Sequence, residues 1–247
     1  MDRYGLIGKI LVHSFSKKFF TEKFANEQIE ARYDLFELPV IEEFAELVQT
    51  EGLRGLNVTI PYKQEVMPFL NELDEMAKEI GAVNTIQFRH EGGRLILKGF
   101  NTDAIGFENS LTPLLRPCHT KALVLGTGGA SKAIVYILNK IGIEPQHVSR
   151  TRKEGVLAYE DLTPEVVAAH KLIVNCTPLG TFPKVDEMPQ FPAEYLTQEH
   201  LVYDLIYNPE ETKLCRLARE RGAATKNGLE MLHGQAIAAW KIWNAVR

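Results

Sequence analysis

The chain has few cysteines, no long apolar run and no excess of positive charge. Its cysteines, Cys118, Cys176 and Cys215, are scattered, so they predict neither a disulfide framework nor a structural zinc site. No apolar run reaches the ~18 residues of a membrane-spanning helix, and the N-terminus shows no pattern of a secretory signal. The net charge of −4 argues against a general nucleic-acid binder. We therefore expect a cytoplasmic protein with no metal site and with neither membrane nor nucleic acid as a partner.

The composition is that of a chain able to form one large or two modest domains. Of the 247 residues, 45% are hydrophobic and 24% are charged, an average balance for a globular protein. Short β-rich segments alternate with stretches of helical period, which predicts an α/β fold with helices flanking parallel strands. The predicted strands are residues 4–8, 33–39, 55–61, 84–90, 94–100, 121–126, 147–150, 172–176 and 201–207, with a hairpin turn at 91–93. The predicted helices are residues 17–30, 41–49, 131–141, 210–222 and 229–246.

Two regions predict domain boundaries, one near residues 103–111 and one near residues 227–228. They divide the chain into two α/β domains, residues 1–103 with 229–247 and residues 104–228. The second domain is predicted to be a Rossmann-type nucleotide-binding unit, and the C-terminal helix is expected to return to the first domain. Such a protein is expected to close over its ligands, with hinges at the two boundaries.

A glycine-rich turn lies between a predicted strand and a predicted helix. It consists of Gly126, Thr127, Gly128, Gly129 and Ala130. Glycines allow a tight turn and a close approach of the backbone to a phosphate, and the first amides of a helix favour an anion. Ser131 breaks the strict G-x-G-x-x-G spacing, and a plain strand-to-helix turn would also explain the glycines. The strand before the turn and the helix after it favour a dinucleotide site.

The segment after the next strand indicates which dinucleotide would bind. An NAD enzyme usually has an acidic residue there, which binds the ribose hydroxyls. This chain has Ser149, Arg150 and Thr151, followed by two more basic residues. A planar, permanently charged guanidinium suits a phosphate. A solvated basic loop is the alternative, but the position of the cluster predicts NADP as the cofactor.

Four polar motifs lie near the ends of strands or the starts of helices in the first 103 residues. They contain Ser14 and Ser16, residues 57–63, residues 81–85 and residues 99–103. Ligands of open α/β sheets bind at the carboxyl ends of the strands, and these hydroxyl, amide, ammonium and carboxylate groups suit a small polyhydroxylated acid. Each motif alone has a structural explanation, such as a turn, a helix start or an N-cap.

The order and spacing of the motifs resemble those of the shikimate dehydrogenase family along nearly the whole chain. The matching segments are residues 4–8, 57–63, 81–85, 101–103, 126–133, 175–180, 203–209 and 228–236. The resemblance implies the reversible NADPH-dependent reduction of 3-dehydroshikimate to shikimate, a step of aromatic amino-acid biosynthesis. It also implies that the first domain binds the substrate and the second binds NADP.

The resemblance further implies a role for individual residues. Lys63 and Asp103 are expected to be the catalytic pair. The substrate would be bound by Ser14, Ser16, Thr59, Lys63, Asn84, Asp103, Tyr207 and Gln235. Hydride transfer to a ketone builds negative charge on its oxygen, so a cation that also supplies a proton lowers the barrier. A lysine fits this role, and a nearby carboxylate could orient it; which of the two transfers the proton is left open.

On the cofactor side, the resemblance implies that residues 126–130 bind the pyrophosphate. Arg150, flanked by Ser149 and Thr151, would bind the 2′-phosphate. Leu205 and Gly228 would lie by the nicotinamide, with Glu75 on the same side.

The first motif departs from the family pattern. Lys17 stands where a proline is usual and Phe20 stands where a histidine is usual, although both serines are kept. Phe20 is expected to pack inward with Phe24 rather than to contact the substrate. In this family the serines are thought to hold the substrate carboxylate, so the resemblance implies that Ser14 and Ser16 can still do so, and the changes at Lys17 and Phe20 leave open whether that contact is altered.

Three alternatives remain open at this point. The chain could act on quinate, or on both quinate and shikimate, with NAD. It could be a non-catalytic nucleotide-binding regulator on the same fold, because a fold alone does not establish a reaction. It could also oxidise an unrelated hydroxy acid. The oligomeric state is expected to be a monomer or a homodimer.

Overall fold

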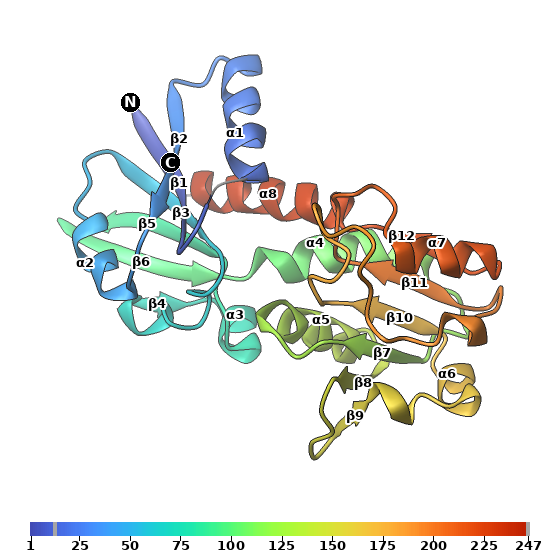
Figure 1. The fold of residues 1–247 in the computed structure, drawn as a ribbon. Coiled ribbons are helices and arrows are strands. Elements are labelled where there is room, and N and C mark those ends of the chain that lie inside the picture. The colour runs from blue at the N-terminus through green and yellow to red at the C-terminus, as the bar shows by residue number, and fades with distance from the viewer. Residues whose placement is uncertain (12–13, 246–247) are drawn as a thin grey trace. The chain divides into compact units, whose positions relative to one another are not determined.

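The computed structural model describes residues 1–11 and 14–245 (Figure 1). The chain divides into two compact units, which we call unit 1 and unit 2. Unit 1 contains Met1–Thr102 and Gln235–Arg247, and unit 2 contains Asp103–Gly234. Within the described ranges, no helix combines the length and the apolar character needed to cross a membrane.

Unit 1 is built on a six-stranded mixed sheet in the order β2-β1-β3-β5-β6-β4. Its parallel half has β1 (Asp2–Gly8) between β2 (Ala31–Glu37) and β3 (Leu53–Val58). In the other half, β5 (Thr85–Glu91) is antiparallel to both β3 and β6 (Arg94–Phe100), and the short β4 (Glu72–Leu73) extends the edge. The carboxyl ends of β1, β2 and β3 therefore lie at one edge of the sheet.

The helices of unit 1 are α1 (Phe15–Asn26), α2 (Phe44–Leu47), α3 (Glu75–Ile80) and the second part of α8 (Leu229–Asn244). An aromatic cluster joins α1 and α8 to the sheet, and its buried rings include Tyr4, Phe20, Phe24, Tyr33 and Trp243. Gly55 has no side chain, and a Cβ there would overlap the Trp243 indole. The absence of a side chain at Gly55 thus lets α8 pack closely on β3.

Unit 2 contains a fully parallel six-stranded sheet in the order β12-β11-β10-β7-β8-β9. The strands are β7 (Lys121–Leu125), β8 (Glu144–Ser149), β9 (Val156–Ala158), β10 (Leu172–Asn175), β11 (Leu201–Asp204) and β12 (Ala224–Lys226). The strand order reverses between β7 and β10, which is the point where doubly wound sheets bind dinucleotides.

The helices of unit 2 are α4 (Thr102–Leu111), α5 (Gly129–Lys140), α6 (Pro164–Ala169) and α7 (Lys213–Glu220), together with the start of α8. The first residue of α4, Thr102, still belongs to unit 1. The central strands are buried because helices cover both faces of such a sheet: all four residues of β10 and all four of β11 are buried, and only the last residue of each, Asn175 and Asp204, has a side-chain amide or carboxyl group. Near the end of unit 2, Gly234 lies against Gly106 of α4, where a Cβ would be 3.2 Å from the Gly106 Cα. This contact places the first residues of α8 in unit 2.

The predicted class, two α/β domains with the C-terminal helix returning to the first, is confirmed. The hairpin turn is confirmed as well, with positive φ at Gly92 and Gly93. The segment 41–49 differs from the prediction, since it is a 3-10 turn (Ile41–Glu43) followed by the short α2. The short strands β4, β9 and β12 had no counterpart among the predicted elements. The predicted end of the last helix, Val246, lies outside the described residues.

Candidate functional site

Three of the predicted substrate residues of unit 1 follow the carboxyl ends of β1 and β3. Ser14 is the N-cap of α1, where its hydroxyl oxygen accepts the Lys17 amide at 3.2 Å. Ser16 is buried in the first turn of the same helix. Thr59 follows β3 directly, and its methyl group fills the space above Gly8. The structure thus brings the strand end that bears Thr59 next to the last residue of β1.

Lys63 and Asn84 come from neighbouring segments of unit 1. The carbonyl of Lys63 accepts the amide of Val83 at 2.7 Å, which holds the Lys63 turn beside the residue that precedes Asn84. Lys63 is half-buried, whereas Asn84 is buried. The ammonium of a half-buried lysine can keep contact with solvent while the stem of the side chain lies against the protein.

Asn84 has a defined side-chain orientation. Its Oδ1 accepts the backbone amide of Thr102 at 2.7 Å, and the hydroxyls of Thr102 and Thr85 lie at 3.1 and 3.2 Å. A backbone N–H can only donate, so the oxygen of the carboxamide must face Thr102. The Nδ2 group, with its two N–H donors, therefore points away from the Thr102 amide.

The hydrogen bond from the Thr102 amide to Asn84 Oδ1 also fixes the start of the helix that contains Asp103. Thr102, held by Asn84, is the first residue of α4, and Asp103 follows it in the first turn of that helix. Asp103 is half-buried and is the first residue of unit 2.

Gln235 is a buried residue of α8 in unit 1, and Tyr207 is an exposed residue after β11 in unit 2. Their predicted contacts with a substrate stay predictions.

The glycine-rich turn of unit 2 has the form expected for binding a dinucleotide. Gly126, at the end of β7, has φ +102°, a conformation that favours glycine. Gly128 has φ −78° and is the N-cap of α5, and it contributes no side-chain hydrogen bond to the helix. A Cβ on Gly128 or on Gly129 would meet no atom within 4 Å. The packing of the chain does not require glycine at these two positions, and the backbone there is open to the close approach of a ligand.

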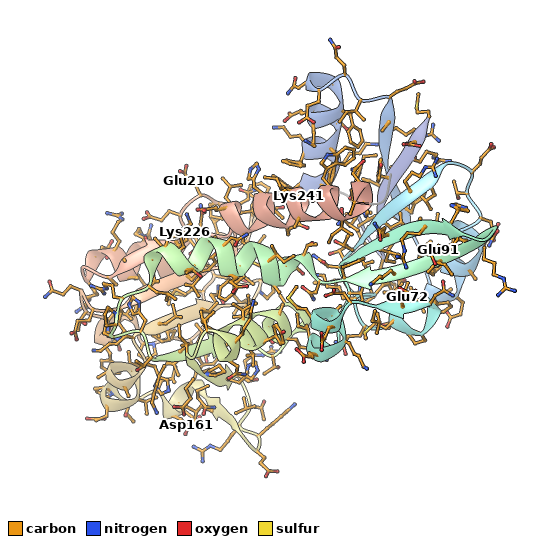
Figure 2. The ribbon with its side chains drawn as sticks, turned by 180° about the vertical axis from the view of Figure 1, so that it is seen from behind. Glu72, Glu91, Asp161, Glu210, Lys226 and Lys241 are labelled. Carbon is orange, nitrogen blue, oxygen red and sulfur yellow. The ribbon has the colours of Figure 1, made fainter. Side chains whose placement is uncertain are left out.

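The basic cluster follows β8, next to the glycine turn. The Gly126 amide donates to the Val148 carbonyl at 2.8 Å, which places the end of β7 beside the end of β8. Ser149 closes β8, and the exposed Arg150 and Thr151 follow. Arg152 forms an ion pair with Asp161, a residue labelled in Figure 2, whereas Arg150 has no ion pair within the described part of the chain. Arg150 and Lys153 are thus the exposed cations of this loop that are not engaged in an ion pair within the described residues.

The predicted nicotinamide residues Leu205 and Gly228 lie together. The Gly228 amide donates to the Ile206 carbonyl at 3.0 Å, and a Cβ on Gly228 would collide with the Leu205 carbonyl. Glu75, predicted on the same side of the cofactor, belongs to unit 1 and is exposed in the first turn of α3. Its role stays a prediction.

Sequence reasoning gave no role to Asp204, the buried last residue of β11. Its carboxylate accepts hydrogen bonds from the Asn175 amide (3.0 Å), the Ile206 backbone N–H (3.0 Å) and the Thr212 hydroxyl (2.7 Å). Burial nevertheless raises the pKa of this carboxyl to about 6. The group fixes the loop that contains Leu205 and Tyr207. The sequence feature that could have identified Asp204 was its position at the end of a predicted strand, within the segment 203–209 that matches the family.

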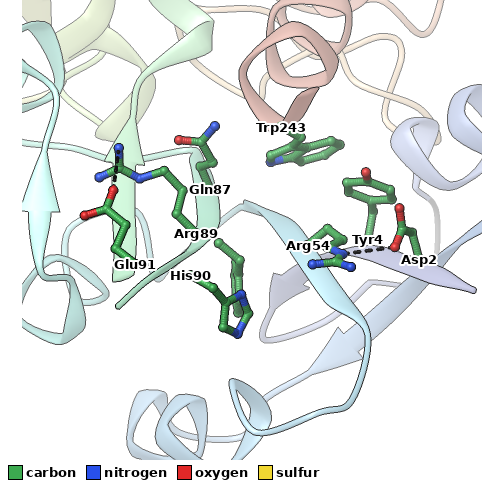
Figure 3. Close-up of a pocket in the computed structure, with 9 residues that line it drawn as sticks. Asp2, Tyr4, Arg54, Gln87, Arg89, His90, Glu91 and Trp243 are labelled. Atoms are coloured by element: carbon green, nitrogen blue, oxygen red, sulfur yellow. Dashed lines mark hydrogen bonds and ion pairs between the residues drawn. The ribbon is translucent and has the colours of Figure 1, made fainter. Parts of the chain in front are cut away.

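A cavity of about 350 Å³ lies at the opposite edge of the sheet of unit 1 (Figure 3). It adjoins the first residues of β1 and β3 and the last residues of β5. Its cations are already matched by carboxylates, since Arg54 pairs with Asp2 at 2.9 Å and Arg89 pairs with Glu91 at 3.4 Å. The cavity therefore has no unmatched charge to select a ligand, and none of the predicted site residues lines it.

Comparisons with known proteins agree with this geometry. Residues 6–86 match the family model described as the shikimate dehydrogenase substrate binding domain. The chain is 36% identical to the NADP(+) shikimate dehydrogenase of Desulforamulus reducens, over 97% of this chain and 88% of that one. Among solved structures, the Thermus thermophilus shikimate 5-dehydrogenase in complex with NADP(H) and shikimate aligns with a TM-score of 0.85 and 31% identity, covering 100% and 94% of the two chains. The Corynebacterium glutamicum quinate dehydrogenase in complex with NAD aligns with a TM-score of 0.87 and 26% identity, covering 99% and 94%.

Proposed function

Because this chain belongs to the shikimate dehydrogenase family, we propose that it catalyses the reversible NADPH-dependent reduction of 3-dehydroshikimate to shikimate. The observation that carries the proposal is the match over nearly the full length to enzymes of that name, since it includes both units. Residues 1–103 with 229–247 bind the substrate and residues 104–228 bind NADP. The enzyme acts as a monomer or a homodimer in the cytoplasm.

In unit 1, Asn84 offers its two N–H donors to a substrate hydroxyl. Ser14, Ser16 and Thr59 supply hydroxyl groups at the neighbouring strand ends. The Ser14 oxygen already accepts the Lys17 amide, so its own hydroxyl proton is left to donate to the substrate carboxylate. Gln235 and Tyr207 complete the contacts. These groups position the ring of the substrate for reaction, which accounts for much of the barrier reduction in such enzymes.

Lys63 and Asp103 act at the reacting oxygen. When bound, NADPH supplies the hydride for the ketone carbon. The Lys63 ammonium stabilises the negative charge that develops on the ketone oxygen and donates a proton to it. Asp103 orients the ammonium and accepts a hydrogen bond from a substrate hydroxyl. In the reverse direction, Lys63 takes the proton back from the alcohol.

In unit 2, the open faces of Gly128 and Gly129 and the first amides of α5 fit a pyrophosphate. Arg150, with Ser149 and Thr151 beside it, binds the 2′-phosphate. Leu205 and Gly228 contact the nicotinamide, and Glu75 lies on the same side. The Arg150 guanidinium, which forms no ion pair with any of the described residues, favours NADP over NAD.

The test is the reduction of NADP⁺ by the purified protein with shikimate, compared with a Lys63→Ala variant. We expect the variant to lose about 10²–10⁴-fold in kcat, because a positioned proton donor contributes a factor of that size, with its NADP⁺ affinity unchanged. Lys78→Ala is the control, since Lys78 is an exposed lysine of the same unit. Turnover by Lys63→Ala within a few-fold of the native protein would contradict the assigned role.

The similarity to a quinate dehydrogenase in complex with NAD motivates a second arm of this assay. Quinate and NAD⁺ are offered in place of shikimate and NADP⁺. Faster turnover of quinate with NAD⁺ would assign the chain to that activity. Binding of NADP⁺ with no turnover of either acid would instead indicate another hydroxy acid or a non-catalytic regulator.

A further inference from the structure

Tyr33, a residue of β2 with no predicted role, is contacted by three residues of α1. Burial raises the pKa of its hydroxyl, and the Ser16 side chain, as a hydrogen-bonding neighbour, lowers that pKa. The Lys17 ammonium donates to the Tyr33 carbonyl. The Phe20 ring stacks on the Tyr33 ring, with centroids 4.8 Å apart and planes at 10°. Lys17 and Phe20 are the two positions at which the chain departs from the family motif, so both departures contact the same tyrosine.

The Tyr33 hydroxyl also begins a buried chain of hydrogen bonds that leads to Asn84. It donates to Asn57 Oδ1 at 2.7 Å, and Asn57 Nδ2 donates to the Thr85 hydroxyl oxygen at 3.2 Å. The Thr85 hydroxyl lies 3.2 Å from Asn84 Oδ1 and 3.0 Å from the Thr102 hydroxyl. Every link is shielded from water, since Tyr33, Asn57 and Thr85 are 2%, 3% and 0% exposed.

Such a chain fixes side-chain rotamers because a buried polar group that loses its partner is left unsatisfied. Asn57 has both ends of its carboxamide occupied, and it is oriented by the Tyr33 hydroxyl at one end and by Thr85 at the other. The network therefore has Ser16 at one end and Asn84 at the other, and both are substrate residues of the proposed function.

We infer that Tyr33 is a positioning residue for the substrate, which holds Ser16 and Asn84 in their binding rotamers. The inference rests on the proposed function for the identity of the substrate. In this chain, Phe20 and Lys17 hold Tyr33 in place from α1, where the family motif has a histidine and a proline. Tyr33 itself does not touch the reacting atoms.

The test is Tyr33→Phe, which removes one hydroxyl and keeps the stacked ring. We expect the KM for shikimate to rise about tenfold, the effect of one or two lost hydrogen bonds, while kcat and the KM for NADP⁺ stay within about twofold. The matched control is Tyr203→Phe, which removes the buried hydroxyl that lies 2.6 Å from the Ser110 hydroxyl in unit 2. This control should leave the KM for shikimate unchanged even if it lowers thermal stability equally.

A double-mutant cycle with Ser16→Ala separates positioning from general destabilisation. If Tyr33 acts through Ser16, Tyr33→Phe should raise the KM by a smaller factor in the Ser16→Ala background than in the native one. Equal factors in both backgrounds, or an unchanged KM in a folded Tyr33→Phe protein, would overturn the inference.

A second measurement does not depend on turnover. Hydrogen exchange of the Thr102 amide, which donates to Asn84 Oδ1, should be faster in Tyr33→Phe and unchanged in Tyr203→Phe. If the native protein failed to oxidise shikimate, the proposed function would fall while faster exchange still supported the positioning role. Unchanged exchange would overturn that role whatever the substrate proves to be.

Discussion

At the scale of single residues, the buried carboxyl of Asp204 makes stability depend on pH. Burial raises its pKa from 3.8 to about 6 in the folded protein. The folded state therefore holds this proton more tightly than the unfolded chain does. The resulting stabilisation is fully present below about pH 4, the unfolded pKa, and is lost as the pH rises through about 6.

We predict that Asp204→Asn removes this dependence. Between about pH 4.5 and 7.5, the free energy of unfolding of the native protein should fall relative to that of the variant by on the order of 1–2 kcal/mol. Urea unfolding of both proteins at several pH values measures the difference. A difference that does not change with pH would contradict the raised pKa.

The residues that sequence reasoning identified are those whose role follows from a local motif. Gly126 and the lysine turn at Lys63 are examples. Tyr33 and Asp204 were not identified because their partners are distant in sequence. Tyr33 bonds to Asn57, 24 positions away, and Asp204 bonds to Asn175, 29 positions away. No local pattern predicts which buried hydroxyl or carboxyl will meet which amide.

At the scale of elements, a substitution in the turn between β7 and α5 can affect ligand binding without affecting the stability of the fold. Gly129 is the first residue of α5, where a Cβ would meet no protein atom within 4 Å. Alanine favours a helix over glycine by about 0.5–1 kcal/mol. The protein alone would therefore accept alanine at this position, whereas a phosphate lying against the backbone would not.

Gly129→Ala should accordingly keep or slightly raise the unfolding temperature while raising the KM for NADP⁺ by about tenfold or more. The KM for shikimate at saturating NADP⁺ serves as the internal control. Native affinity for NADP⁺ in this variant would show that the open face of the turn is not the phosphate site.

The elements that the sequence predicted well include α5, which has helical periodicity, and β7, a continuous apolar run before a glycine-rich turn. The strands β4, β9 and β12 contain only two or three residues each. Such segments have no measurable alternation, and they become strands only because a longer neighbour offers its free edge. The start of α4 is likewise fixed by a remote group, the Asn84 side chain at Thr102.

At the scale of the whole molecule, each unit has a hydrophobic core of its own. One core cluster, which includes Leu56 and Ile86, belongs to unit 1, and another, which includes Ile173 and Val202, belongs to unit 2. A ligand that binds only the folded state stabilises it by mass action. NADP⁺ at 100 times its Kd should therefore add about 2.7 kcal/mol to the free energy of unfolding.

Stabilisation by NADP⁺ also tests whether Arg150 binds the 2′-phosphate. Arg150→Ala should show a much smaller shift of the thermal transition at the same NADP⁺ concentration, with the transition of the ligand-free protein unchanged. Arg152→Ala is the matched control, since Arg152 is engaged with Asp161. Equal shifts of the thermal transition in the two variants would contradict the assignment of Arg150 to the 2′-phosphate.

The aromatic cluster of unit 1 has an optical consequence. Both tryptophans of the chain, Trp240 and Trp243, lie in the part of α8 that belongs to unit 1. The ring centroids of Trp240 and Tyr4 are 5.4 Å apart, and the Trp243 indole N–H donates to the Ile86 carbonyl at 3.0 Å. Intrinsic indole fluorescence, excited at its red edge, therefore originates in unit 1 alone. In the protein without cofactor, unit 1 can therefore be followed in solution without attaching a label.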